Sequence, residues 1–286
     1  MPRLAKPMSP FLVPLRFEAG YRRAIHGLIM SQVPLQVDDS GVDGWLGRLS
    51  AVSFDRAFQA EAQRIAMRLV RDLNIHNVFG WRGVTKEVTG GAKVLPYLHE
   101  TRRGSIGRVM YEQILESTSY ISIIPTKLSD DLVSQVKRAR SAGEGENEVI
   151  ELVGRSFYSQ LVKKINLVAQ TDPHRINSAL TEARSADLTI QCFIWRTAGD
   201  TSVRPSHQKM DEVVVFWDDL PSPEALIGLP SILGYYAPGN CPNCRCNAVP
   251  VLSVETLFRV IYSRIKVYWM GSIIQMTRQQ FLQIMR

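Results

Sequence analysis

The sequence predicts an α+β protein: a helical N-terminal domain followed by a smaller C-terminal domain of helices packed on a short antiparallel sheet with long Pro- and Gly-rich loops. Through most of the first 125 residues apolar side chains recur every three or four positions, whereas from Ile190 they recur every second position. With 45% hydrophobic and 21% charged residues, the composition is that of ordinary globular proteins and argues against wholesale disorder.

Helices are expected at two places in the N-terminal half. The first covers about residues 15–31, with Pro14 where a helix can start. The second is longer, with Ser53 as its N-cap. Its apolar face is formed by Phe54, Phe58, Ala62, Ile65, Leu69 and Leu73. Glycines at 90–91 and 104–107 predict loops, and Pro125 marks the expected end of this domain.

The C-terminal domain is expected to begin with helices and to end with strands. Helices are predicted from Ser129 to about Arg140, at about 147–153, at 156–170, and from Asp172-Pro173 to about Ala186. Residues 190–195 alternate as a half-buried strand does, and further strands are predicted at 213–217 and near 248–252. Residues 218–247 show almost no regular pattern.

We therefore expect domains at 1–125 and 126–252, and an apolar, basic tail at 253–286. In the tail one helical stripe is formed by Leu257, Val260, Ile261, Ile265 and Tyr268. Such a stripe is either core or a partner-binding helix, and we interpret it as the latter.

The net charge of +7 is unevenly distributed. Residues 1–140 hold 20 Lys/Arg against 13 Asp/Glu, residues 141–252 hold 9 against 13, and residues 253–286 hold 5 against 1. Basic ends fit contact with DNA phosphates or an acidic protein, although an arginine-rich helix face can also be merely solvated. The candidate contact residues are Arg56, Arg64, Arg68, Arg71, Arg259, Arg264 and Lys266.

No secretory signal or membrane span is expected. The first residues contain four prolines and no long apolar run, and the most apolar stretch, near 257–276, is interrupted by Arg259, Arg264 and Lys266. We therefore expect the protein to be made and to work in the cytoplasm.

Three of the four cysteines lie within six residues, at 241, 244 and 246. Together with His207 they form a possible Cys3His zinc site, which would be structural because a closed site leaves no position for a water nucleophile. In the alternative reading these thiols, like Cys192, are small buried apolar groups. His207 would then cap a helix or bond to Asp200 or Asp211.

An ordered set of motifs surrounds this cluster. WRTAGD at 195–200 and VRPSH at 203–207 precede a strand at 211–217, and NCRCxAxPV follows at 243–251. These motifs resemble the C-terminal domain of the phage Mu protein F-like minor head family, also called the phage head morphogenesis domain. YRRAI near the start, QRIAMRLV and NVFGWR resemble its N-terminal half, so the resemblance covers most of residues 11–252. Its structural motif residues here are Trp195, Arg196, Asp200, Arg204 and Asp211.

The chain departs from the family pattern in three places. Glu212 stands where members commonly have glycine, so the turn there is expected to differ. Cys241 is an addition beside the usual Cys-x-Cys pair, and the tail after Leu252 is not accounted for.

The resemblance implies a minor head protein of a tailed phage or prophage, without enzymatic activity. The implied partners are the portal protein, capsid or scaffold proteins, and double-stranded DNA bound through phosphates. The implied location is the bacterial host cytoplasm during assembly and then the virion, in the head interior or at the portal vertex.

Two other functions are carried as alternatives. A metal-dependent nuclease would use His207 as base with Arg196, Asp200, Arg204 and Asp211 around it, although no P-loop, G-x-S-x-G or H-E-x-x-H motif occurs. A toxin-like effector is ranked last, because only the tail is left for a separate module.

Overall fold

A computed structural model describes residues 9–34, 36–86, 88, 91, 104–231, 233–260 and 264–285. The chain forms two compact units, each assembled from segments far apart in sequence. The helical unit comprises Leu15–Val70 and Glu112–Asp172, and the sheet unit comprises Met1–Pro14, Arg71–Tyr111 and Pro173–Arg286. This division does not follow the predicted linear boundary at Pro125, because three helices continue from one unit into the other.

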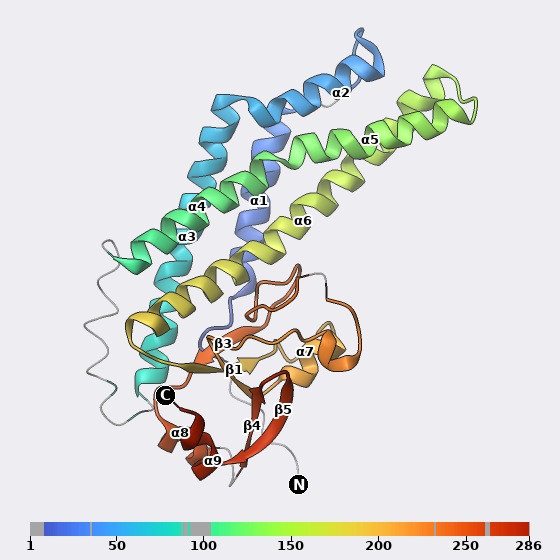
Figure 1. Cartoon of the computed structure of the whole chain (residues 1–286). Coiled ribbons are helices and arrows are strands. Elements are labelled where there is room, and N and C mark those ends of the chain that lie inside the picture. The colour runs from blue at the N-terminus through green and yellow to red at the C-terminus, as the bar shows by residue number, and fades with distance from the viewer. Residues whose placement is uncertain are drawn as a thin grey trace. The chain divides into compact units, whose positions relative to one another are not determined.

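The helices of Figure 1 confirm the expectation that the first part of the chain is mainly helical. They are α1 (Leu15–Gln32), α2 (Gly41–Ala51), the 3-10 turn η1 (Val52–Phe54), α3 (Arg56–Lys86), α4 (Ser105–Ser122), α5 (Ile124–Ser141) and α6 (Glu146–Asp187). The predicted helix at 15–31 is confirmed as α1, which follows Pro14 directly.

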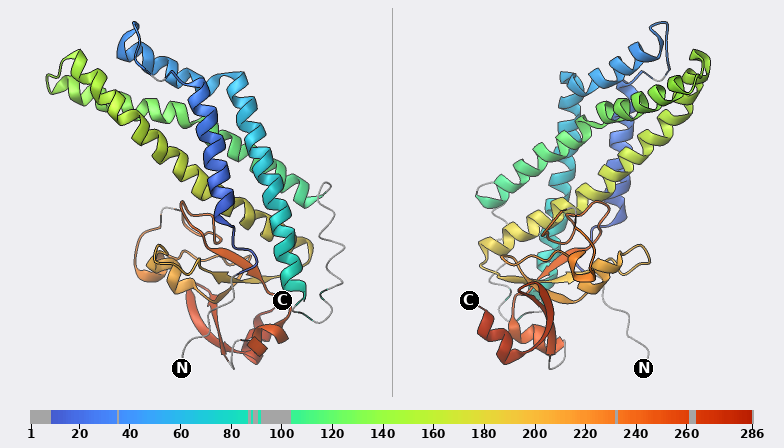
Figure 2. Two further views of the ribbon diagram at one scale, coloured as in Figure 1. Left: turned by 180° about the vertical axis from the view of Figure 1, so that it is seen from behind. Right: turned by 45° about the vertical axis from the view of Figure 1, so that its right-hand side comes forward.

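Part of the core of the helical unit lies where α2, α5 and α6 meet. Trp45 of α2 is buried and packs edge-to-face on Phe157 of α6, with ring centroids 5.6 Å apart. The hydroxyl of Ser129 on α5 donates to the carbonyl of Leu46 at 2.9 Å. In both views of Figure 2, α5 and the first part of α6 run side by side, and Lys164 of α6 pairs with Asp131 of α5.

The predicted N-cap of the long helix is wrong. The backbone N–H of Phe58 donates to Asp55 Oδ1 at 2.8 Å, so Asp55 caps α3. Ser53 lies in η1 instead, and its hydroxyl accepts from the backbone N–H of Thr126 at 3.0 Å, at the start of α5. Phe54, predicted on the buried face, is 73% exposed because it precedes the helix.

Two predicted interruptions of helices are also wrong. Residues 105–107 are the first turn of α4 and not a loop, and Gly90 lies outside the described residues. The helices predicted at 147–153, 156–170 and 172–186 form the single helix α6, with Pro173 inside it. Asp172 is buried and accepts from the Tyr21 hydroxyl at 2.9 Å, and such packing offsets the cost of about 3 kcal/mol for an interior proline.

The sheet unit contains five strands in the order β3-β1-β2-β4-β5. They are β1 (Cys192–Arg196), β2 (Val213–Phe216), β3 (Asn247–Pro250), β4 (Arg264–Trp269) and β5 (Ser272–Thr277). All neighbouring strands pair antiparallel except β2 and β4, which pair parallel with Val214 opposite Val267. The predicted α+β class and the three predicted strands are confirmed, although the sheet is mixed.

Both faces of the central strands are covered. Phe193, Trp195, Val213 and Val215 belong to one buried cluster, whereas Cys192, Val214 and Phe216 belong to the other. The prediction of a half-buried strand at 190–195 is therefore wrong, because alternation here separates two apolar faces. The first face is packed against residues of the irregular segment 218–247, such as Tyr236, and the second against residues after 252.

The interpretation of residues 253–286 as a partner-binding helix is wrong. This tail forms α8 (Val254–Val260), the β4–β5 hairpin and α9 (Arg278–Ile284), so Ile265 and Tyr268 of the expected helical stripe lie in β4. The hairpin turn is Met270-Gly271, and both residues have positive φ, 46° and 83°, as a tight two-residue turn requires. The tail is therefore part of the sheet.

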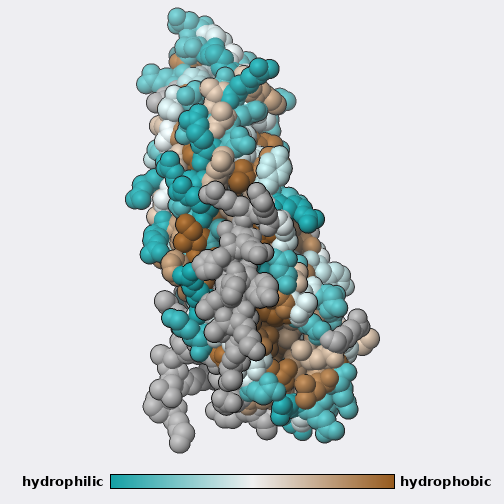
Figure 3. Space-filling view, turned by 90° about the vertical axis from the view of Figure 1, so that its left-hand side faces the viewer, coloured by the Kyte–Doolittle hydropathy of each residue, from teal (hydrophilic) through white to brown (hydrophobic). Residues whose placement is uncertain are grey.

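Polar side chains are common on the surface of the helical unit (Figure 3). In Figure 3 hydrophilic side chains predominate around the end of the helical unit drawn at the top, with scattered apolar residues between them. Within the described residues no helix is long and apolar enough to cross a membrane.

A pair of neighbouring residues on α9 tests the role of the tail. Phe281 is fully buried and packs on Phe216 of β2 with ring centroids 5.9 Å apart, whereas Leu282 is 48% exposed. Phe281→Ala should lower the free energy of unfolding by about 3–5 kcal/mol, because it opens a cavity beside the central strand. Leu282→Ala should change it by less than about 0.5 kcal/mol.

Chemical denaturation followed by far-UV circular dichroism measures both values. Equal, small effects of the two substitutions would contradict the assignment of the tail to the core.

A candidate metal centre in the sheet unit

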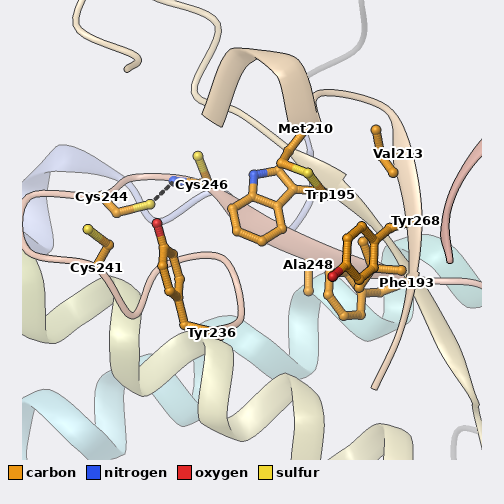
Figure 4. Packing of buried hydrophobic residues seen from close by; sticks show 11 residues of the cluster. Phe193, Trp195, Met210, Val213, Tyr236, Cys241, Cys244, Cys246, Ala248 and Tyr268 are labelled. Atoms are coloured by element: carbon orange, nitrogen blue, oxygen red, sulfur yellow. Dashed lines mark hydrogen bonds between the residues drawn. The ribbon is translucent and has the colours of Figure 1, made fainter. Parts of the chain in front are cut away.

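A cysteine and histidine cluster joins the end of the irregular segment 218–247 to a short helix. His207 comes from the short helix α7 (Pro205–Met210), and Cys244 and Cys246 precede β3. His207 Nδ1 lies 3.4 Å from Cys244 Sγ and 3.5 Å from Cys246 Sγ. The ligand atoms of all three residues lie within 4.8 Å of one another, and each residue is at most 4% exposed. In Figure 4 the cysteines and Tyr236 lie together on one side of Trp195.

The sequence Cys241-Pro-Asn-Cys244 explains how the cysteines reach the same place. The backbone N–H of Cys244 donates to the Cys241 carbonyl at 2.9 Å, and Asn243 has φ 58°. Proline at the second position and a left-handed Asn at the third are the preferences of a type II turn. After this turn the backbone N–H of Cys246 donates to Cys244 Sγ at 3.4 Å, which fixes that thiol beside the next one.

The other ring nitrogen of His207 is held by a tyrosine and a glutamate. Nε2 lies 3.0 Å from the Tyr236 hydroxyl, which donates to Glu224 at 2.7 Å and 2.9 Å from its two oxygens. Since that hydroxyl proton is directed to Glu224, the Tyr236 oxygen accepts the proton of Nε2. In the neutral ring Nδ1 then carries no proton, whereas in the protonated ring both nitrogens donate and Nδ1–H faces the sulfur atoms.

Burial and neighbouring groups shift the pKa values of the residues in this cluster. Burial lowers the pKa of His207, but hydrogen bonds and charge from Cys241 and Cys244 outweigh it and raise that pKa to about 9. The hydrogen bond from Cys246 holds the pKa of Cys244 well below its usual value, with His207 adding to the effect against burial. The same hydrogen bond and burial raise the pKa of Cys246. The site therefore favours thiolate at Cys244.

Cys241 occupies the rim of the cluster. Arg204 Nη1 donates to Cys241 Sγ at 2.5 Å, and Nη2 donates to the Pro242 carbonyl at 2.7 Å. Cys241 is 8% exposed and lies outside the group of three whose ligand atoms are all within 4.8 Å. By contrast Cys192 faces the opposite side of the sheet, where burial raises its pKa to about 12.

The remaining motif residues fasten loops to one another. Asp211 accepts from the backbone N–H and hydroxyl of Thr197, both at 3.1 Å, and Asp200 pairs with Arg245 at 2.5 Å. Arg196 pairs with Glu212 at 3.1 Å.

Neither Asp200 nor Asp211 is the partner of His207, contrary to the alternative bonding predicted from the sequence. The carboxylates proposed for a nuclease site are engaged in these loop contacts, and Trp195 packs edge-to-face on His207 with centroids 5.7 Å apart.

The expected difference of the turn at Glu212 from the family's glycine stays a prediction, although Glu212 does adopt a left-handed backbone conformation. Its φ is 66°, in the region that favours glycine, and its backbone N–H donates to the Trp195 carbonyl at 2.9 Å. The Arg196 ion pair holds its side chain. Tyr236 and Glu224 were not identified from the sequence, because no spacing in an irregular segment indicates which side chains turn inward.

The predicted contact arginines are dispersed. Arg56, Arg64, Arg68 and Arg71 are exposed along α3, where Arg64 pairs with Glu61 at 2.6 Å and Arg71 with Asp72 at 3.1 Å. Arg264 and Lys266 are exposed on β4. The side chain of Arg259 lies outside the described residues.

Comparison with known proteins finds a similarity to a family of phage proteins. Residues 130–249 match the family model described as phage Mu protein F like protein, which confirms the resemblance for the region that holds β1, α7, β2 and the cluster. Over these residues the chain is similar to the phage Mu protein F-like family.

Two curated relatives match parts of the chain. The "Minor head protein GP7" of Bacillus phage SPP1 is 27% identical over 133 residues, 45% of this chain and 42% of that protein. An "Uncharacterized protein" of Haemophilus influenzae is 29% identical over 90 residues, 32% of this chain and 18% of that protein. The chain thus spans less than half the length of each, and no solved structure matches it.

Proposed function

We propose that the protein is a minor head protein of a tailed phage or prophage that acts by binding other head proteins at or near the portal vertex. The observation that carries this proposal is the family match over residues 130–249 together with the similarity to the minor head protein of phage SPP1. Assembly in the host cytoplasm and incorporation into the virion follow from the same proposal.

The surface of α3 supports contact with a protein partner. Ile75 and Phe79 are 51% and 58% exposed and lie four residues apart on the part of α3 that belongs to the sheet unit. Large apolar side chains at helical spacing are typical anchors for a groove on another protein. Arg71, four residues before Ile75, already pairs with Asp72, so the apolar residues carry the argument for a contact with the portal, capsid or scaffold protein.

Co-purification with the portal protein encoded by the same phage tests this function. The expected result is a complex of defined stoichiometry by native mass spectrometry, weakened by Ile75→Ser/Phe79→Ser because two apolar anchors are lost. Tyr235→Ser, at a residue that is 73% exposed in the sheet unit, is the matched control and should bind as the unaltered protein does. A chain that remains monomeric beside the portal would refute the portal role.

We also propose that the protein contacts packaged double-stranded DNA, or DNA during delivery, through phosphates. Among the described residues Arg56 and Arg68 are exposed on α3 and have no ion-pair partner, so they can release counterions on binding DNA. Such binding would not depend on base sequence.

The salt dependence of DNA binding checks this contact. Affinity for a DNA duplex should fall steeply with salt, and Arg56→Ala/Arg68→Ala should reduce the slope of log K against log salt by about 2, since each phosphate contact contributes about 0.9. Arg278→Ala removes an arginine that is already paired with Glu255 and should leave the slope unchanged. Binding insensitive to salt would contradict a phosphate contact.

The structure offers less support for the alternative, a metal-dependent nuclease. The carboxylate that reaches His207 is Glu224, through Tyr236, while Asp200 and Asp211 hold loop backbone and arginine. If one zinc ion were held by His207 and all three cysteines, its four positions would be filled and none would remain for an attacking water.

A further inference from the structure

We propose that His207, Cys241, Cys244 and Cys246 bind one structural zinc ion, with Arg204 as its counter-charge and the Tyr236–Glu224 pair fixing the histidine ring. This inference is independent of the proposed head function, since it concerns the folding of the sheet unit. Its basis is the geometry of three buried ligand atoms and of the groups around them.

The separations of the ligand atoms fit a tetrahedral zinc ion. With Zn–S bonds of about 2.3 Å and Zn–N bonds of about 2.0–2.1 Å, tetrahedral angles put sulfur and nitrogen roughly 3.6 Å apart. His207 Nδ1 lies 3.4 Å from Cys244 Sγ and 3.5 Å from Cys246 Sγ. Two sulfurs and a nitrogen are therefore already near the distances that zinc requires.

The second ring nitrogen of His207 is arranged as in metal sites. A ligating histidine usually directs its other N–H to an acceptor, which fixes the tautomer and orients the ring. Here Nε2 lies 3.0 Å from the Tyr236 oxygen, and Glu224 holds that hydroxyl. The residue pair thus leaves Nδ1, which faces the sulfurs, as the coordinating atom.

In the proposed site Cys241 supplies the fourth ligand, and Arg204 balances the charge. Three thiolates and one Zn²⁺ carry a net charge of −1, which is costly to bury unpaired. Arg204 donates to Cys241 Sγ and brings this charge to zero. Cys241 lies outside the group of three ligand atoms, and the proposal requires its thiol to turn inward from the Cys241–Cys244 turn to become the fourth ligand.

Zinc suits this donor set better than harder cations do. Thiolate and imidazole ligands select zinc, whereas Mg²⁺ and Ca²⁺ take oxygen ligands. The ligands would tie α7 to the last residues of the irregular segment 218–247, just before β3. Bound metal would therefore stabilise a region with little regular secondary structure.

The first test is the metal content of the full chain, purified without a metal-binding tag. Inductively coupled plasma mass spectrometry should find one zinc per chain. X-ray absorption spectroscopy should show that the zinc has three sulfur neighbours at about 2.3 Å and one nitrogen neighbour at about 2.0–2.1 Å. Cys192→Ala, at the buried cysteine outside the cluster, should keep the zinc. Protein that contains no zinc and takes up none when zinc is added would overturn the proposal.

The second test replaces the ligands one at a time. A chelator experiment on the unaltered protein accompanies it, because that experiment stays informative if a variant fails to fold. Cys244→Ser and Cys246→Ser should abolish zinc binding, and Cys241→Ser should do the same if the site has four protein ligands. A Cys241→Ser variant with undiminished affinity would overturn that part. In the unaltered protein, a strong chelator should lower the melting temperature and expose the cluster thiols to a thiol reagent, and added zinc should reverse both. Thiols and melting temperature indifferent to the chelator would count against a structural metal.

The third test addresses the histidine's support. Tyr236→Phe removes the acceptor of the Nε2 proton while keeping the ring, and should weaken zinc about 10–100-fold in competition with a chelator. Tyr235→Phe, at the exposed neighbouring tyrosine, is the control and should bind as the unaltered protein does. Equal zinc affinities of the two variants would show that Tyr236 does not support His207 as a ligand.

Discussion

The sheet unit depends on one constraint: its two central strands are apolar on both faces. All four residues of β2 are buried, and in β1 Cys192 points to one face while Phe193 and Trp195 belong to the other. A strand of this kind is stable only when both of its faces are covered. The chain supplies one cover from the irregular segment 218–247 and the other from the tail.

The two covers are built by different physical means. The tail uses regular structure, since the β4–β5 hairpin adds strands to the sheet and α9 places Phe281 on Phe216. The irregular segment has little regular secondary structure and is held in place by side-chain contacts. Tyr236 and Glu224 hold His207 from one side, and Arg204 holds the turn at Cys241 and Pro242 from the other. The cluster thus occupies the place where such a segment needs a fixed anchor.

Elements that depend on the local sequence pattern could be predicted from the sequence, whereas side-chain roles and elements that depend on distant contacts could not. The helix at 15–31, the three strands and the grouping of His207 with the cysteines follow from period, spacing and residue type. Pro173 was misread because its helix is retained by packing that local propensity does not record, including Asp172 with Tyr21. The tail was misread because Ile265 and Tyr268 fit a helical stripe as well as a strand, although Gly271 carried a turn signal. Tyr236 and Glu224 carried no signal, because their roles arise only when the loop closes on α7.

The central claim, that the tail is an integral cover of the sheet, is tested most directly by native-state amide hydrogen exchange of the full chain. Backbone amides of β4 that bond within the sheet should exchange as slowly as those of β2, because the parallel pairing of Val214 with Val267 makes the two strands open together. Rapid exchange throughout β4 while β2 remains protected would show a tail that is independent of the sheet, and would contradict the account.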